Sequence, residues 1–209
     1  MIASAHGRPR SPLVLSAALL AALALTQCDR APAEPVATAD ARPKAPARCV
    51  RKTPDTPPPA VPKGPDPRCP RDPEGNPPTV PMGKVSFPSS KTAPELQTEL
   101  MLTERHRERG LMFRQQMTED HGMLFVFEDV APRTFWMRNT CLPLDMLFVN
   151  DDGFIAGIVE NVPTMNDEPR GIPCPVRFVL EVNAGFARRH GVVAGQMLKI
   201  DGLPKPASP

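Results

Sequence analysis

Four of the polar side chains in a stretch rich in large apolar residues, in the middle of the chain, are of types that could support binding chemistry. The stretch covers residues 110–147, and the four side chains belong to Arg114, Asn139, Thr140 and Asp145. A guanidinium, an amide, a hydroxyl and a carboxylate can together bind a polar ligand or fix a buried loop. The sequence therefore marks this stretch as the place where a site would form.

Asp145 lies in a predicted strand that is apolar on both faces. Alternation along residues 144–150 places Asp145 on one apolar face, while the residues between form a second apolar face. A carboxylate without a partner is unfavourable in such a dry place. We expect Asp145 to be buried and charge-paired with Arg114 or Arg138, with nearby polar side chains and main-chain N–H groups completing its surroundings.

Two functional interpretations of this cluster remain open beside a purely architectural role for Asp145. The first is a non-catalytic binding or scaffold module for a small polar ligand, a glycan or an envelope protein. The second is a hydrolase in which Asp145 works with Glu181 or Glu160, since paired carboxylates can cleave glycosidic bonds. No serine-hydrolase, zinc-ligand or phosphate-loop motif is present in the sequence, which favours the binding module and assigns no catalytic residue. The predicted binding residues are Arg114, Trp136, Arg138, Asn139, Thr140, Asp145 and Glu181.

The elements that must position these side chains are predicted to be short strands with one or two short helices. Apolar alternation and β-branched or aromatic runs predict strands at Gln97–Leu102, Met123–Phe127, Thr134–Arg138, Leu144–Val149, Phe154–Val159, Val176–Val182 and Met197–Ile200. A helix is expected over residues 103–109, where Thr103 can cap the start and Gly110 the end, and another over 186–190. The fold class is therefore mainly β, a compact antiparallel sandwich or barrel-like domain.

Five short pieces of the sequence occur in an order and spacing typical of one family. They are Gly110–Arg114, Gly122–Phe127, Phe135–Thr140, Pro143–Asp145 and Leu180–Val182. Over residues 85–201 the chain resembles the domain of unknown function 192 family. That resemblance implies a small β-rich extracytoplasmic domain, and it implies no activity, substrate or cofactor.

The N-terminus has the features of an export signal. Arg8 and Arg10 precede the apolar run Leu13–Leu25, which is too short for a comfortable membrane span. The following Leu25-Thr26-Gln27-Cys28 resembles a bacterial lipoprotein box, although Gln27 departs from the usual small residue. We expect removal of residues 1–27 and lipidation of Cys28, which would give a periplasm-facing lipoprotein anchored in a membrane. The alternative is cleavage after Ala31-Pro32-Ala33, which would leave a soluble periplasmic or secreted protein.

Proline marks the boundary of the folded domain. More than half of the chain's 29 prolines fall within residues 29–83. Such a segment resists packing into a core and favours an extended polyproline-like chain. The sequence predicts a disordered, lipid-anchored tether over residues 28–83, a folded domain over 84–203 and a disordered tail over 204–209.

Four cysteines remain if Cys28 is acylated, and an even number suits an oxidising compartment. Three pairings of the four are possible. Pairing within each segment is favoured, Cys49–Cys69 in the tether and Cys141–Cys174 in the domain, because a cross-pair would tie a flexible arm to the core, which nothing else in the sequence requires.

Other partners and cofactors find little support in the composition. The histidines of the domain are scattered singly and C-x-x-C is absent, so no metal site or cofactor is expected. Residues 84–203 carry 13 Lys and Arg against 16 Asp and Glu, a net charge of −3. With a single Trp and no Tyr in the chain, nucleic acid is not an expected partner.

Overall fold

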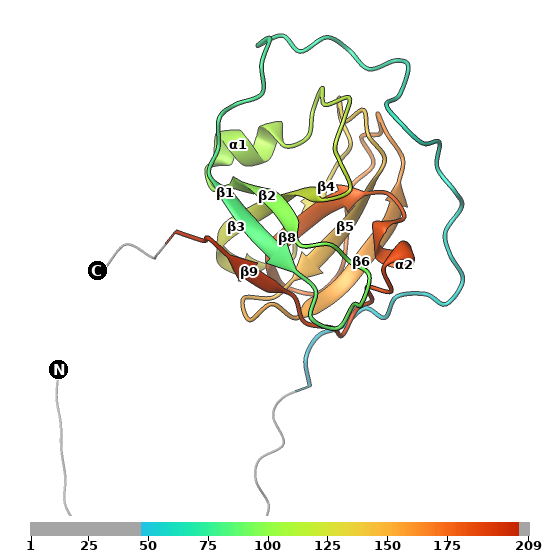
Figure 1. Ribbon diagram of the computed structural model, residues 1–209, viewed down its shortest axis with the longest axis vertical. Coiled ribbons are helices and arrows are strands. Elements are labelled where there is room, and N and C mark those ends of the chain that lie inside the picture. Colours follow the sequence, from blue (N-terminus) through green and yellow to red (C-terminus); the bar gives the residue numbers. More distant parts are fainter. Residues whose placement is uncertain (1–46, 205–209) are drawn as a thin grey trace, which may run out of the picture. The chain divides into compact units, whose positions relative to one another are not determined.

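The computed structural model describes residues 47–204. The predicted signal peptide, the lipidation site Cys28 and residues 205–209 lie outside this part of the chain. A curled seven-stranded sheet forms its centre, with strand order β6-β5-β8-β3-β2-β1-β9 (Figure 1). The strands are β1 Met82–Ser86, β2 Leu96–Met101, β3 His121–Ala131, β5 Leu144–Val149, β6 Ile155–Val162, β8 Val176–Asn183 and β9 Lys199–Asp201. A second, small sheet pairs β4 Thr134–Phe135 with β7 Arg170–Gly171, and the helices are α1 Glu104–Arg109 and α2 Phe186–Arg189.

The predicted fold class, mainly β with two short helices, is confirmed. One strand pair differs from the antiparallel expectation, because β2 and β3 run parallel, with Glu99 opposite Met123. Parallel neighbours need a crossover connection, and α1 lies in that connection. As predicted, the Thr103 side chain caps α1 by accepting a hydrogen bond from the His106 N–H, and the helix stops at Gly110, which has a φ of 44°.

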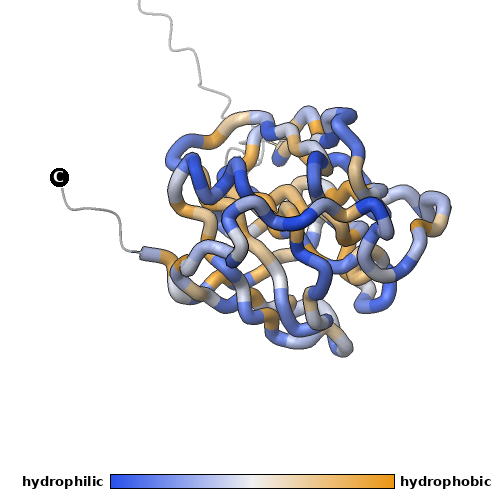
Figure 2. The backbone as a smooth tube through the Cα atoms, turned by 90° about the horizontal axis from the view of Figure 1, so that it is seen from above, coloured by the Kyte–Doolittle hydropathy of each residue, from blue (hydrophilic) through white to orange (hydrophobic). Residues whose placement is uncertain are grey.

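Apolar residues cover both faces of the seven-stranded sheet. The first face contains Leu124, Leu147 and Leu180, and it packs against Phe186 of α2. The second face contains Met123, Phe125 and Phe148 among others, and its core extends to the loops that follow α1 and β4. Figure 2 shows the apolar positions gathered inside the domain, while hydrophilic positions follow the outer loops. The central strands β5 and β8 are therefore covered on both sides.

Residues 47–81, which we call the arm, form an extended segment that runs around the outside of the domain (Figure 1). Two disulfides tie the arm to the domain, Cys49–Cys174 and Cys69–Cys141. The expectation that each disulfide stays within its own segment, Cys49–Cys69 and Cys141–Cys174, is therefore wrong. Both observed pairs bring Cα atoms within 5.3–5.5 Å of each other, which is the spacing that a disulfide requires. Within the arm, the disulfides at Cys49 and Cys69 differ from the disordered tether that was expected over residues 28–83.

Side chains of the domain hold the arm between the two disulfides by binding its main-chain carbonyls. The guanidinium of Arg188 donates to the carbonyl oxygens of Pro54, Asp55 and Thr56 at 2.6–3.3 Å, and Asn161 Nδ2 donates to Pro59 O at 3.1 Å. An extended proline-rich chain makes no internal hydrogen bonds. Its carbonyls are therefore free to accept these donors, and the composition that discourages a core does not prevent docking.

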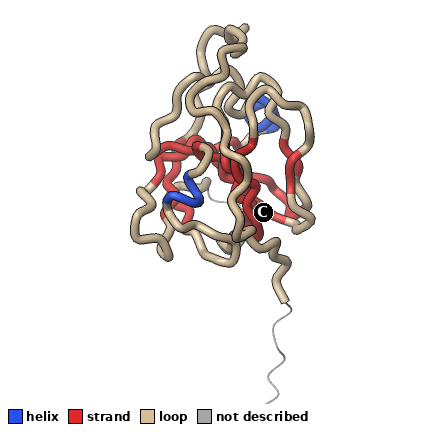
Figure 3. The backbone as a smooth tube through the Cα atoms, turned by 90° about the vertical axis from the view of Figure 1, so that its right-hand side faces the viewer, coloured by secondary structure: helices blue, strands red, loops and turns tan. Residues whose placement is uncertain are grey.

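Further along the chain, the arm reaches α1. Arg109 is ion-paired with Asp72, and Arg105 with Glu74 at 3.5 Å. Figure 3 shows the loops wrapped around the central strands, with both helices at the periphery. Neither helix of the described part has the length or apolar character needed to cross a membrane.

Candidate functional site

Asp145 is fully buried, as predicted, but main-chain groups rather than an arginine surround its carboxylate. Oδ1 accepts hydrogen bonds from the N–H groups of Asn161 at 2.8 Å and Gly185 at 3.0 Å, and Oδ2 accepts one from Ala187 at 3.0 Å. The expected pairing with Arg114 or Arg138 is wrong. The carboxylate joins β5 to the end of β6 and to the start of α2.

Two of the three donors belong to residues with a positive φ. Asn161, at a register shift near the end of β6, has a φ of 51°, and Gly185, at the start of α2, has a φ of 78°, so both lie in the left-handed region. Burial raises the pKa of Asp145, while the three N–H donors oppose that rise because they stabilise the ionised form. This arrangement supports an architectural role for Asp145.

The two arginines proposed as its partners lie elsewhere and bind other carboxylates. Arg114 pairs with Glu99 at 2.7 Å, on the second face of the sheet. Arg138 pairs with Asp167 at 3.2 Å, and its guanidinium lies 4.3 Å from the ring centre of Trp136. The structure therefore separates the predicted binding set into several local contacts.

Asn139 contributes main-chain contacts to the loop that precedes β5. It has a φ of 52°, and its carbonyl accepts a hydrogen bond from the Phe113 N–H at 2.8 Å. That bond joins the loop to the segment that follows α1. Asn139 is one of the predicted binding residues that does not line a described cavity.

The two carboxylates proposed for a hydrolase do not face one another. In the β5–β8 register Asp145 is opposite Val182, while Glu181 is opposite Met146. Because side chains alternate along a strand, Asp145 points to the first face and Glu181 to the second. Glu160 is bound to Arg188 at 2.9 Å, and its side chain is only 4% exposed. The expected arrangement, with two carboxylates on one open cleft, is not formed by these residues.

A cavity of about 560 Å³ opens beside α1 on the second face of the sheet. Three of the predicted binding residues line it: Trp136, Thr140 and Glu181. The residues that sequence reasoning missed are the aromatic Phe125, Phe127 and Phe135 and the basic Arg107, Arg109 and Arg133. We call this cavity the aromatic cavity.

Phe135 is the centre of the aromatic wall. Its ring stands edge-on to Phe125, with 4.8 Å between the ring centres, and edge-on to Phe127, with 6.4 Å. The guanidinium groups of Arg133 and Arg107 lie 3.9 Å and 5.2 Å from the ring centre of Phe127. Such ring and cation–π contacts favour a fixed wall geometry.

The guanidinium groups at the rim of the aromatic cavity already have protein partners. Arg107 donates to the carbonyl oxygens of Leu102 and Val126 at 2.8 Å and 2.9 Å. Arg133 is paired with Asp129, and Arg109 with Asp72 of the arm. The rim is therefore held in place by the arm as well as by the domain.

Glu181 contributes a buried carboxyl group on the inner, sheet side of the aromatic cavity. Its side chain is 4% exposed, and it lies between Met123 and Met146 of the neighbouring strands. No group in residues 47–204 donates a hydrogen bond to this carboxyl group. Burial alone raises the pKa of Glu181 to about 8, so that the group is mostly protonated at pH 7.

The alternation of side chains along the strand distinguishes Glu181, because its side chain points to the other face of the strand from those of Leu180 and Val182. Parity alone predicts a solvent-facing position or an arginine partner. The missing information was that β8 is a central strand with a second apolar layer above it. A sequence signal for that layer does exist in the run of aromatic residues along β3 and β4.

Comparison with known proteins identifies the family of the chain. Residues 86–200 match the family described as an uncharacterised group, domain of unknown function 192 (DUF192). The chain belongs to this family. No curated protein matches the chain.

Two solved structures resemble the DUF192 domain. One is a Sinorhizobium meliloti protein described as a "putative transcription regulator", with 41% identity and a TM-score of 0.54 over 58% of this chain and 96% of that chain. The other is a protein of unknown function from Novosphingobium aromaticivorans, with 32% identity and a TM-score of 0.51 over 56% of this chain and 83% of that chain. These likenesses support the fold and the family assignment.

Both disulfides cross the boundary of the DUF192 match. Cys49 and Cys69 lie in the arm, outside residues 86–200, whereas Cys174 and Cys141 lie inside that range. The two bonds indicate an oxidising, extracytoplasmic location.

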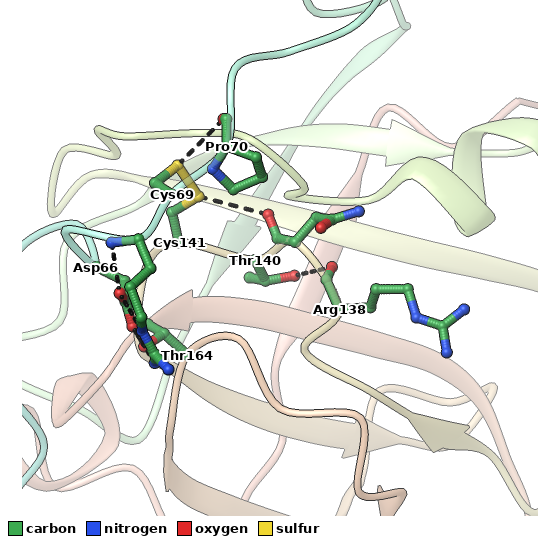
Figure 4. The surroundings of a disulfide bond; sticks show 9 residues. Asp66, Cys69, Pro70, Arg138, Thr140, Cys141 and Thr164 are labelled. Atoms are coloured by element: carbon green, nitrogen blue, oxygen red, sulfur yellow. Dashed lines mark hydrogen bonds and ion pairs between the residues drawn. A yellow bond between two sulfur atoms is a disulfide. The ribbon is translucent and has the colours of Figure 1, made fainter.

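Cys141 directly follows Thr140 of the aromatic cavity, so its disulfide fixes the loop that carries Thr140 (Figure 4). Asp66 supports the same loop from the arm. Its N–H donates to Cys141 O at 2.7 Å, and its carboxylate accepts from the Thr164 hydroxyl at 2.6 Å. Hydrogen bonds from Arg68 and then Thr164 hold the pKa of Asp66 well below its usual range. The arm thereby positions one wall of the cavity.

A second cavity of about 670 Å³ lies between residues 60–64 of the arm and residues 115–119. Among its polar groups, Arg189 pairs with Glu119 at 2.6 Å and Asn183 Nδ2 donates to Met117 O at 2.9 Å. Within residues 47–204, no cluster of three or more His, Cys, Asp or Glu residues could hold a metal ion. The aromatic cavity is therefore the stronger candidate site.

Proposed function

We propose that this DUF192 domain is a non-catalytic binding module that holds a small organic ligand in the aromatic cavity. The observation that carries the proposal is the combination of an aromatic wall with the buried, unpartnered carboxyl group of Glu181. Small-molecule sites are typically concave, mostly apolar and equipped with a few polar groups that orient the ligand. A volume of about 560 Å³ lies within the range of such sites.

The composition of the lining supports binding rather than catalysis. Among the described residues that line the aromatic cavity there is no His, Cys or Ser. The hydroxyl group of Thr140 donates to the main-chain oxygen of Arg138 at 3.3 Å, and no hydrogen bond joins it to a basic side chain of the described residues. Nucleophilic and general acid–base mechanisms need a second group within hydrogen-bond reach of the first, and Glu181 has none.

The proposal is tested by measuring ligand-induced stabilisation of the full chain, purified in detergent. A set of small aromatic and alicyclic compounds should include members that raise the melting temperature, because a ligand at 100 times its Kd adds about 2.7 kcal/mol to the free energy of unfolding. Phe135→Ala removes the centre of the wall and should abolish the shift. Val193→Ala, an exposed apolar residue outside the lining, is the matched control and should retain it. Equal shifts in both variants would contradict the proposal.

We further propose that the protein is a membrane-anchored lipoprotein of the cell envelope. The sequence features that support this are Arg8 and Arg10, the apolar run Leu13–Leu25 and Cys28 at its end. The oxidising location indicated by the disulfides agrees with export. Cys28→Ser should move the protein from the membrane pellet to the soluble fraction. A Cys28→Ser protein that stays in the pellet to the same extent as the wild type would rule out the lipid anchor.

A further inference from the structure

We infer that the ligand of the aromatic cavity carries a basic nitrogen, which binds as an ammonium group at the carboxylate of Glu181. This inference rests on the proposed binding function and specifies its ligand class. Glu181 is the buried carboxyl group of the lining, and its side chain is 4% exposed. An organic ammonium ion would supply both the counter-charge and the hydrogen-bond donors that this group lacks within the described residues.

The charged groups around Glu181 are committed to other partners. On its own strand, Arg177 lies on the same face, and its guanidinium donates to Phe127 O at 3.3 Å. On the adjoining strands, the residues opposite Glu181 are the apolar Met123 and Met146. Beyond Met123, Glu99 of β2 is paired with Arg114 at 2.7 Å. Among the described residues of the sheet, no cation therefore neutralises Glu181.

The rim of the cavity leads to the same conclusion. Of the three guanidinium groups there, Arg107 binds two main-chain carbonyls, while Arg109 and Arg133 pair with Asp72 and Asp129. Glu108 of α1 adds a negative charge to the lining. The positive and negative charges of the rim therefore nearly balance. A cationic ligand can enter past the rim, and none of the three rim guanidinium groups pairs with Glu181.

Ligand binding should be linked to the loss of a proton. Burial raises the pKa of Glu181 to about 8, so the free site holds a proton at pH 7. When an alkylammonium ion enters, the Glu181 O–H bond breaks, the proton goes to solvent, and the carboxylate pairs with the ammonium group. The apparent affinity for an amine should therefore increase with pH up to about 8, by up to tenfold per pH unit.

The test compares benzylamine with benzyl alcohol, which have nearly the same shape, by titration calorimetry on the full chain at pH 6, 7 and 8. Benzylamine should bind more tightly as the pH rises, and its heat should vary with the ionisation enthalpy of the buffer because a proton is released. Benzyl alcohol should show neither effect. E181Q should lose the pH dependence and the preference for the amine while still binding benzyl alcohol. E128Q changes an exposed carboxylate on β3 outside the lining, and it should behave as the wild type does.

The outcomes separate the two proposals. Equal, pH-independent affinities for the amine and the alcohol would overturn the ammonium inference and leave the binding function standing. An amine affinity that falls with rising pH would also overturn the inference, because it would mean that the protonated form of Glu181 binds the amine better than the carboxylate does. Failure of both compounds and of the wider compound set would reject the binding function, and the inference with it.

Discussion

Two buried carboxyl groups on neighbouring strands have opposite environments. Asp145 on β5 faces the first side of the sheet and accepts three main-chain hydrogen bonds. Glu181 on β8 faces the second side and accepts none from the described residues. A satisfied buried carboxylate stabilises a fold, whereas an unsatisfied one lowers stability and is available to a ligand.

Asp145→Ala should lower the free energy of unfolding by about 3–5 kcal/mol, because it leaves three enclosed N–H groups without an acceptor. Asp145→Asn should lower the free energy of unfolding by less. Its side-chain oxygen can still accept from the N–H groups of Asn161 and Gly185, while its NH2 group faces the Ala187 N–H. Urea unfolding of both variants checks the order. An Asp145→Ala protein as stable as the wild type would contradict the architectural role of Asp145.

Glu181 should make the protein less stable as the pH rises. Its pKa is about 8 in the folded protein against an ordinary value of 4.5, so the folded state binds more protons than the unfolded state between these values. Stability should then fall by up to about 1.4 kcal/mol per pH unit from pH 4.5 to pH 8 and level off above. Glu181→Gln should remove this component of the slope, and melting curves at pH 5, 7 and 9 measure it. The same slope in both proteins would show that Glu181 does not titrate in this way.

The sequence could predict the burial of Asp145 but not its partners. Apolar residues on both faces of residues 144–150 require that the strand be covered. The donors, however, are main-chain N–H groups of Asn161, Gly185 and Ala187, and every residue except proline has such a group. Only the path of the chain determines which of them reach the carboxylate.

At the scale of elements, predicted and observed strands agree where alternation is strong and differ where turns intervene. Residues 144–149 and 176–182 are strands as predicted, and the predicted helix over 103–109 is present as α1. Residues 134–138 form a strand only at 134–135, because the chain turns toward Asn139, whose φ is 52°. The parallel pairing of β2 and β3 depends on a long-range crossover, which local patterns do not encode.

Arg188 of α2 joins an element of the domain to the arm, and its removal should release the arm locally. Arg188→Ala leaves Glu160, whose side chain is 4% exposed, without its cation, and we expect a loss of about 1–3 kcal/mol. It also frees the carbonyls of Pro54, Asp55 and Thr56. Cleavage before Asp55 by an Asp-specific endoprotease should become faster.

Arg188→Lys is the control for this experiment. A lysine keeps a positive charge for Glu160 but cannot provide the planar fork that binds several carbonyls at once. Its stability should lie between those of the wild type and Arg188→Ala, with cleavage before Asp55 still accelerated. Unchanged cleavage in both variants would show that the disulfides alone hold this part of the arm.

At the scale of the whole molecule, the folded unit is larger than the DUF192 match. The match covers residues 86–200, whereas the two disulfides attach the arm to the domain from residue 49 onward. The proline content of residues 29–83 indicated an extended chain, and the arm is extended. Composition could not show that this extended chain lies on the domain, since its contacts come from residues about 70 to 130 positions away.

Peptide mapping without reduction should recover the Cys49–Cys174 and Cys69–Cys141 peptides. Changing both Cys69 and Cys141 to Ser should lower stability by about 3–5 kcal/mol, because the bond closes a loop of 72 residues in the unfolded chain. The double variant should also weaken ligand binding in the aromatic cavity, whose Thr140 precedes Cys141. Recovery of a Cys49–Cys69 peptide from the native protein would refute the observed connectivity.

The nested order of the disulfides has a consequence for biogenesis. In a chain that crosses the membrane from its N-terminus, Cys49 and Cys69 emerge first, and each must wait for a partner that emerges much later. An oxidase that joins thiols as they appear would link Cys49 to Cys69 and trap the arm away from its docking surface. Maturation of this protein should therefore depend on an isomerase that reshuffles mispaired thiols, and a host lacking that isomerase should accumulate the misbridged form.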